Sequence, residues 1–135
     1  MAALGTRLLT LTIGGEDYTA EVSNCRITSG DAEGGFLSFA AAAEGGAREY
    51  KLAFTGVQDT DADTIWDLLW SQAGATVAAV IAPAGVTGDT FTGNVVISEP
   101  DGDILGGEAN SSASARFTFD AEWTFTAKPT RVPAV

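Results

Sequence analysis

The residues best suited to chemistry in this sequence are two carboxylates, Asp120 and Glu122, which stand two positions apart. Residues two apart in an extended strand project from the same face, so the two acids would lie within reach of each other. A pair of carboxylates in that arrangement can perform general acid–base catalysis. Two acids on a solvated strand face are far more often ordinary surface charges, and no other catalytic group accompanies them.

A second group of acids, in the segment 99–112, offers oxygen ligands of the kind that calcium prefers. Asp101 and Asp103 match the first two ligand positions of an EF-hand loop. The next ligand position holds Leu105, and Glu108 does not stand where the closing glutamate should. A calcium- or carbohydrate-binding β-sandwich module that uses this loop is therefore only a minor alternative.

The single cysteine, Cys25, alternates with Ile27 opposite Asn24 and Arg26. This pattern favours a small buried hydrophobe over a nucleophile, because no His or Lys stands near it in sequence to lower the thiol pKa. The chain contains no histidine, so it lacks the commonest general base, the commonest metal ligand and every Ser–His or Cys–His dyad. We predict that the protein is not an enzyme and that it carries no cofactor and no metal.

Asp120 and Glu122 belong to the most regular stretch of the chain, residues 115–127 (ARFTFDAEWTFTA). Apolar and polar side chains alternate along it, which indicates a half-buried β-strand. The apolar face comprises Phe117, Phe119, Ala121, Trp123 and Phe125. The polar face comprises Arg116, Thr118, Asp120, Glu122, Thr124 and Thr126. We expect the core to assemble against the apolar face, and a strand of this length to need long partners in this molecule or in the next one.

One helix is expected, over about residues 60–73, with Thr60 as its N-cap and Asp63 at the third helical position. Its apolar stripe carries two tryptophans, either of which could face a neighbouring subunit instead of the core, since Trp is enriched at interfaces. The residues expected to anchor the core or an interface are Trp66, Leu69, Trp70, Phe117, Phe119 and Trp123.

Further strands are expected over 7–13, 17–28, 36–43, 48–56, 75–82 and 90–98, with a hairpin turn at Gly14 and Gly15 and loops at 29–35 and 99–112. The strand at 36–43 is the least typical, because its alanines favour helix. The strand at 75–82 is apolar on both sides, which predicts a central strand covered on both faces.

The order of strands, one helix and more strands predicts a mainly β fold, an antiparallel sandwich or barrel with one flanking helix. The 135 residues are expected to form a single domain, 1–135, with an extended C-terminal arm at about 128–135.

The charge balance limits the partners that the protein can bind. Eighteen acidic residues against seven basic ones give a net charge of −11. Binding to nucleic acid without sequence preference, or to anionic lipid, requires a basic surface that this composition does not provide. The excess of acid serves either solubility alone or the repulsion of nucleic acid from a particular surface. No run approaches the roughly 18 apolar residues of a membrane-spanning helix, and the N-terminal residues are expected to form a strand, not a secretory signal.

Seven short segments share their order and spacing with one family of virus proteins. They are DYTAEV at 17–22, YKLAFTGVQD at 50–59, IWDLLW at 65–70, FTG at 91–93, LGGEA at 105–109, FTFDAEW at 117–123 and KPT at 128–130. Together they resemble the major tail tube proteins of long-tailed, siphovirus-type bacteriophages. The likeness covers most of the chain, although no single segment is diagnostic.

The resemblance implies a structural virion protein that self-assembles. Such subunits form hexameric rings that stack into a hollow viral tail tube, in which strands from all subunits join into one inner β-barrel. Phage DNA passes through the lumen during ejection without specific binding. The implied partners are further copies of the chain, the tape measure protein, the tail terminator and the distal tail proteins. The protein would be made in the bacterial cytoplasm and reside in the virion tail, with no membrane partner.

On this interpretation the polar face of the strand 115–127 lines the lumen, with acids that repel the phosphates of DNA. The candidate lumen residues are Arg116, Thr118, Asp120, Glu122 and Thr124. Arg116 departs from an acidic lining and would pair with an acid of a neighbour. The loop 29–35 and the two termini are the expected ring-to-ring contacts. A tail terminator, a head–tail joining protein or a capsid decoration protein is the alternative within the same class.

Overall fold

The computed structural model describes residues 4–31, 38–43, 48–85 and 87–133. The strands are β1 (Thr10–Ile13), β2 (Glu16–Asp17), β3 (Val22–Asp31), β4 (Arg48–Val57), β5 (Thr76–Ala82), β6 (Thr90–Val96), β7 (Thr118–Phe125) and β8 (Thr130–Val132). The helices are a 3-10 turn η1 (Thr19–Glu21) and the short α-helices α1 (Phe39–Ala43) and α2 (Ile65–Ser71). The protein is therefore mainly β, as the sequence predicts.

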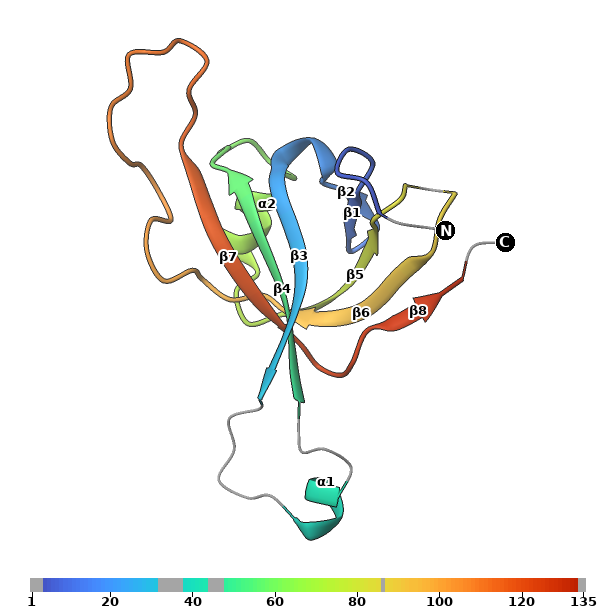
Figure 1. Cartoon of the computed structure of the whole chain (residues 1–135). Coiled ribbons are helices and arrows are strands. Elements are labelled where there is room, and N and C mark those ends of the chain that lie inside the picture. The colour runs from blue at the N-terminus through green and yellow to red at the C-terminus, as the bar shows by residue number, and fades with distance from the viewer. Residues whose placement is uncertain (1–3, 32–37, 44–47, 86, 134–135) are drawn as a thin grey trace.

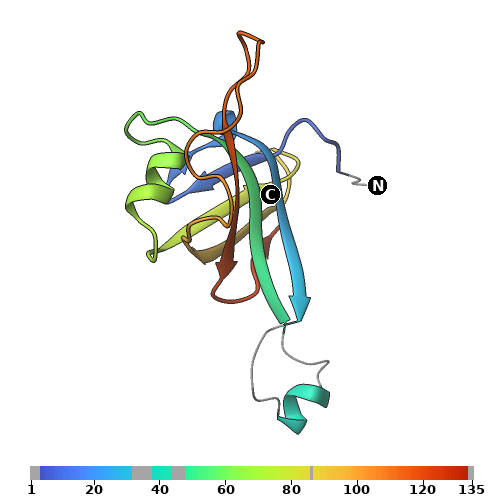
Figure 2. The same ribbon diagram turned by 90° about the vertical axis from the view of Figure 1, so that its left-hand side faces the viewer.

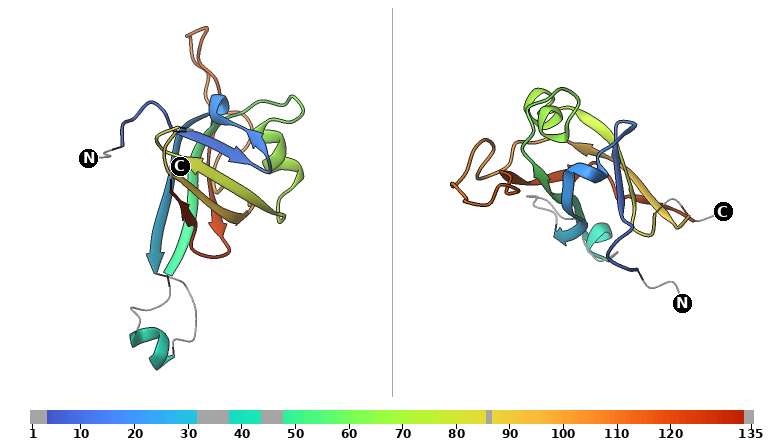
Figure 3. Two further views of the ribbon diagram at one scale, coloured as in Figure 1. Left: turned by 90° about the vertical axis from the view of Figure 1, so that its right-hand side faces the viewer. Right: turned by 90° about the horizontal axis from the view of Figure 1, so that it is seen from above.

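All eight described strands belong to one antiparallel sheet, in the order β2-β1-β5-β6-β7-β4-β3. The last strand, β8, pairs with residues 90–92 of β6, so residues 130–132 of the expected C-terminal arm lie along the sheet, whereas residues 134–135 are outside the described part of the chain. The sheet curls strongly, and β7, β4 and β3 form one side of the curl opposite β1, β5 and β6 (Figures 1 and 3).

The expected sandwich or closed barrel is not formed by the single chain. The sheet is one curled layer whose end strands, β2 and β3, are not paired with each other among the described residues. Closure of a barrel requires the two edge strands to share a hydrogen-bond ladder. The ladder between β6 and β7 is short. It pairs Val95 with Phe125 and Val96 with Thr124, and the Thr126 amide donates to the Asn94 carbonyl at 2.9 Å.

The core fills the inside of the curl. Phe54 contacts the edges of Phe119 and Trp123, with ring centroids 5.9 and 4.8 Å apart and rings almost perpendicular. Such edge-to-face pairs add roughly 0.5–1.5 kcal/mol each beyond the burial of their area. Helix α2 closes one end of the curl with Ile65, Trp66 and Leu69, all buried. The predicted inward face of β7 is confirmed at Phe119, Ala121, Trp123 and Phe125.

Phe117 was expected on that inward face, but its side chain is 48% exposed. The reason is that β7 begins at Thr118, so Phe117 belongs to the preceding loop and not to the paired strand. The prediction for β5 is also wrong in one respect. This strand lies inside the sheet, yet Thr76 and Ala78 are exposed and Val80 is half-buried, so this face becomes covered only toward the end of the strand, at Ala82.

Helix α2 is shorter than expected and begins later. Its N-cap is Thr64, not Thr60, and the Thr64 hydroxyl oxygen accepts a hydrogen bond from the Asp67 amide at 3.1 Å. Asp63 has φ of +64°, a left-handed conformation that is incompatible with a helix running through it. The same Thr64 hydroxyl donates to the Asp59 carbonyl at 2.7 Å, which fixes the turn before the helix.

The expected strand at 36–43 is a helix where the structure describes it, because Phe39–Ala43 forms α1 and residues 36–37 lie outside the described residues. The helix propensity of the alanine run prevails there. Helix α1 stands at the tip of a hairpin arm (Figures 1 and 2). Strands β3 and β4 pair as far as Asp31–Arg48, whereas β4 and β7 stop at Lys51–Thr124, so the arm projects beyond the sheet. The predicted loop 29–35 therefore starts as strand, and its residues 32–35 are not described.

The hairpin at Gly14 and Gly15 is confirmed. Both residues have positive φ, +60° and +87°, between β1 and β2. Turns of this type require that conformation, which costs glycine little.

Candidate functional site

The outer surface of β3, β4 and β7 presents three rows of cross-strand neighbours, which we call the polar face. Its rows are Asn24–Thr55–Asp120, Arg26–Ala53–Glu122 and Thr28–Lys51–Thr124. The rows exist because the register of both ladders brings every second residue of each strand to this side. The structure thus places Asp120, Glu122 and Thr124 together, as predicted, and adds β3 and β4 to the surface they belong to.

The acids of the polar face have partners from the neighbouring strand. The Thr55 hydroxyl donates to Asp120 Oδ1 at 2.6 Å. Lys51 Nζ lies 3.8 Å from Glu122 Oε2 and 4.0 Å from Glu49 Oε1. Solvent-exposed pairs of this kind contribute about 0–1 kcal/mol each. They orient the side chains more than they stabilise the fold.

Two basic side chains offset the negative charge that the sequence predicts for this surface. Arg26 and Lys51 share the rows with Asp120 and Glu122, so the nine residues of the polar face balance in formal charge. The Arg26 guanidinium donates to Asn24 Oδ1 at 2.9 and 3.2 Å, which holds it flat along β3. Glu99 and Asp101 border the face from the loop after β6 and restore a net negative charge.

The polar face forms the floor of a shallow hollow of about 870 Å³, with Ser98, Glu99, Pro100 and Asp101 on its rim. Asp120 and Glu122 are both exposed. A shallow polar surface with exposed acids is suited to contact with a large partner that keeps its water of hydration.

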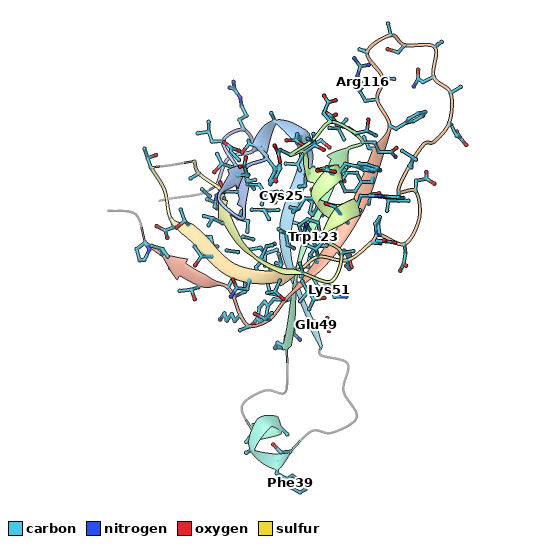
Figure 4. All side chains as sticks on the ribbon, turned by 180° about the vertical axis from the view of Figure 1, so that it is seen from behind. Cys25, Phe39, Glu49, Lys51, Arg116 and Trp123 are labelled. Carbon is cyan, nitrogen blue, oxygen red and sulfur yellow. The ribbon has the colours of Figure 1, made fainter. Side chains whose placement is uncertain are left out.

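Arg116 lies apart from the polar face. Its guanidinium donates to the carbonyls of Ala113 and Ala115 at 3.1 and 2.9 Å. Figure 4 shows it on the projecting loop before β7, far from Lys51 and Glu49. Thr118 opens β7 and pairs with Val57, at the end of the ladder beyond the three rows.

The predicted anchors divide into buried and exposed residues. Trp66, Leu69, Phe119 and Trp123 belong to the core cluster. Trp70 is 54% exposed and stacks on Trp66, with ring centroids 5.3 Å apart. Trp70 is therefore not a core anchor of the single chain, and its exposure leaves it open to a partner.

Gln58 was not anticipated from the sequence. Its amide oxygen accepts from the Gly106 amide at 2.6 Å, and its Nε2 donates to the carbonyls of Gly106 and Thr118 at 3.0 and 2.9 Å. This one side chain thereby joins the loop 97–117 to the start of β7. Glu21 was missed as well, and it accepts from the Ile65 amide at 2.7 Å, at the start of α2. Only a long-range contact reveals either role.

No cluster of three or more His, Cys, Asp or Glu side chains is placed to hold a metal ion within the described residues, the acids of the 99–112 loop included. Cys25 is half-buried, and burial raises the pKa of its thiol to about 11. The thiol is therefore protonated at neutral pH and unreactive as a nucleophile. Among the described helices, none has the length and apolar character needed to span a membrane.

The polar face and the edge of β3 beside it, which pairs with no strand among the described residues, are the candidate functional surfaces. The sequence matches no protein-family model, and comparison with curated proteins finds no significant match.

Proposed function

We propose that the chain is the subunit of a phage tail tube, a structural virion protein that polymerises as stacked hexameric rings around a DNA-conducting lumen. The hexamer and the tail are what the resemblance of the sequence implies. The structural features that support the proposal are the outer edge of β3, which pairs with no strand among the described residues, and the solvent-exposed polar face beside it.

The observation that carries the proposal is the edge of β3. This strand has ten residues and lies at the end of the sheet, with β4 as its partner within the described part of the chain. A long exposed edge offers unpaired N–H and C=O groups to any other strand, and proteins normally shorten or cover such an edge. Pairing of this edge with the sheet of a second copy would satisfy these groups and extend the sheet from subunit to subunit.

In a ring built this way the polar face would repeat around a central channel. Asp120 and Glu122, with Glu99 and Asp101 beside them, would present acids toward passing DNA. Lys51 lies 3.8 Å from Glu122, and Arg26 is hydrogen-bonded to Asn24 along its own strand. Repeated acids in a channel with low-dielectric walls add up to a negative field. Such a wall would keep phosphates in solution and let the duplex slide.

Electron microscopy of the purified protein tests the proposal most directly. We expect a monomer or ring at low concentration and hollow rods of constant diameter as the concentration rises, seen in negative stain and followed by light scattering. A fixed monomer at every protein and salt concentration would overturn the proposal. Isolated rings or caps without rods would instead indicate a tail terminator, a head–tail joining protein or a decoration protein.

A pair of proline variants tests the role of β3. Successive N–H groups of an edge strand alternate between the sheet and the outside, so Thr28→Pro and Ser29→Pro remove one inward and one outward N–H. The variant that loses the inward N–H should melt earlier, because it breaks a bond to β4. The other should keep its thermal stability and lose assembly. If both variants assemble like the parent, β3 is not the assembling edge.

A further inference from the structure

An apolar groove runs along the open side of the curled sheet. It encloses about 530 Å³ between β3 and β4 on one side and β5, β6 and β8 on the other. We call it the basic groove, because all of its charged lining residues are basic. Its apolar lining is Leu9, Cys25, Ile27, Tyr50, Ile81, Pro83, Phe91 and Pro129, and its charged lining is Arg26, Lys128 and Arg131. The groove is hollow because the curl does not close, so core-facing side chains of the edge strand remain partly uncovered there.

The charge of the basic groove is opposite to that of the chain. Three of the seven basic residues line it, in a protein with a net charge of −11. None of the described lining residues is acidic. Arg131 is held by Asp89 at 2.7 Å, and Arg26 is held by the neutral side chain of Asn24 at 2.9 Å, so its charge is not paired with an acid there. Arg26 and Lys128 are both exposed and contribute to the rim. An apolar groove with such a rim selects a partner that is both apolar and acidic.

The chain carries a surface of that description on another side, which we call the acidic ridge. Its apolar members are Trp70, Leu105 and Phe117, and its acids are Asp103 and Glu108. The side chain of Leu105 is 61% exposed, and hydrogen bonds hold the backbone of the residue on each side of it. The Trp66 indole donates to the carbonyl of Ile104, and Gln58 binds Gly106 through its backbone N–H and C=O.

These anchors gather the acidic ridge into one place. Trp70 stacks on Trp66, whose indole reaches Ile104. The ring of Phe117 lies against Gly107, with Cδ1 2.9 Å from where a Cβ of residue 107 would stand. A segment whose backbone is already held by hydrogen bonds loses little conformational entropy when its apolar side chain binds. The ridge is therefore preorganised to insert into a groove.

We propose that the acidic ridge of one copy docks into the basic groove of a second copy, with Leu105 in the groove and Asp103 and Glu108 against Arg26 and Lys128. The inference rests on the proposed function in one respect, that the partner is another copy of this chain. Helix α2 of the ridge and β8 of the groove lie on opposite sides of the curled sheet (Figure 1). Each copy therefore uses both surfaces, and such a heterologous contact closes into a ring or propagates as a filament.

Charge exchange between two variants tests this contact. The groove variant is Arg26→Glu with Lys128→Glu, and the ridge variant is Asp103→Lys with Glu108→Lys. Each alone brings like charges together, so we expect its self-association, measured by sedimentation, to require at least about tenfold more protein. An equimolar mixture should restore association near the parental level, because every groove then meets a ridge of opposite charge. All four changes in one chain should restore it as well.

Matched controls isolate the groove from the neighbouring polar face. Arg26→Lys, and Asp103→Glu with Glu108→Asp, keep every charge and should associate like the parent. Arg26 also belongs to the polar face, so Thr124→Glu serves to add an acid to that face from β7, away from the groove and from the edge of β3, and it should not impair association. Circular dichroism and thermal melting confirm that each variant is folded.

The outcomes separate this inference from the proposed function. If the parent forms rods and both charge variants do so at the same concentration, the ridge–groove contact is wrong and the tube assignment stands. If both variants lose association and the mixture does not regain it, the contact is wrong also. If the parent forms no rods but associates through charges that the mixture restores, the contact is right and the tube assignment fails.

Discussion

Gly56 of β4 stands opposite Phe119 of β7, and the edge of the Phe119 ring occupies the space that a side chain on residue 56 would need. A Cβ built at Gly56 would lie 2.8 Å from Cζ of Phe119 and 3.4 Å from Cγ2 of Ile65. This missing side chain lets the edge of the core ring approach the backbone of β4 at the point where Ile65 of α2 packs against the sheet.

We therefore predict that Gly56→Ala destabilises the protein by about 1–3 kcal/mol, the usual cost of overpacking a well-packed core. Urea denaturation followed by tryptophan fluorescence measures the change. Gly30→Ala is the matched control, because it lies in β3 with no heavy atom within 4 Å of its would-be Cβ. That control should unfold at the parental midpoint or slightly above it. Equal midpoints for the two variants would contradict the prediction.

The two tryptophans of α2 should differ in what they stabilise. Trp66→Ala should cost about 3–5 kcal/mol, because a buried ring and its hydrogen bond to Ile104 are both lost. Trp70→Ala should cost no more than about 1.5 kcal/mol, the scale of one aromatic contact, since the ring is exposed. If the ridge–groove contact forms, Trp70→Ala should weaken self-association more than it lowers the free energy of unfolding. Denaturation and sedimentation of the same samples compare the two effects. Equal losses of unfolding free energy in Trp66→Ala and Trp70→Ala would refute the assignment of Trp66 to the core and Trp70 to the surface.

Cys25 makes stability depend on pH in the alkaline range. Burial raises the pKa of its thiol from 9.0 to about 11, so the folded state holds the proton more tightly than the unfolded state does. The contribution is fully present below about pH 9 and is lost as pH rises through 11, a change of about 2 kcal/mol. The pKa of Tyr18 is also raised, chiefly by burial, and acts in the same direction. The difference between parent and Cys25→Ala isolates the cysteine, and parallel stability curves from pH 8 to 11 would contradict the prediction.

Asp120→Lys combined with Glu122→Lys tests the polar face as a channel wall. Both side chains are exposed, so folding and rod formation should change little, by less than about 1 kcal/mol per lost pair. Preformed rods of the variant should retain duplex DNA in a salt-dependent manner, because lysines bind phosphates and release counterions. Cosedimentation of DNA with rods at rising salt measures this, and the parent is the negative control.

A matched variant locates the effect. Glu16→Lys together with Asp17→Lys changes the same number of charges on β2, away from the polar face. It should bind no more DNA inside the rods than the parent. Equal DNA retention by the two double variants would show that net charge, and not the polar face, controls the interaction.

Periodicity alone determined much of this fold. The alternation in 118–125, the hairpin at Gly14 and Gly15 and the strand 48–57 follow from local rules, because a strand of period two with a half-buried surface has only one way to face the core. The mainly β, antiparallel class was predictable for the same reason. The pairing of acids with Thr55 and Lys51 was not, because the register between β4 and β7 joins residues about 65 positions apart.

The tertiary structure alone decided where alternation stops. Phe117 continues the pattern of residues 115–127, and its carbonyl accepts the last backbone bond from β4, from the Gln58 amide at 2.9 Å. Its ring lies at the end of the paired region, beyond the Val57–Thr118 pair, and stays exposed there. Trp70 is on the outside because α2, which begins at Ile65, turns Ile65, Trp66 and Leu69 toward the core. The basic groove exists only because the curled sheet stays open between β3 and the opposite strands. A property of this kind depends on how distant strands meet, which the order of residues along one strand does not encode.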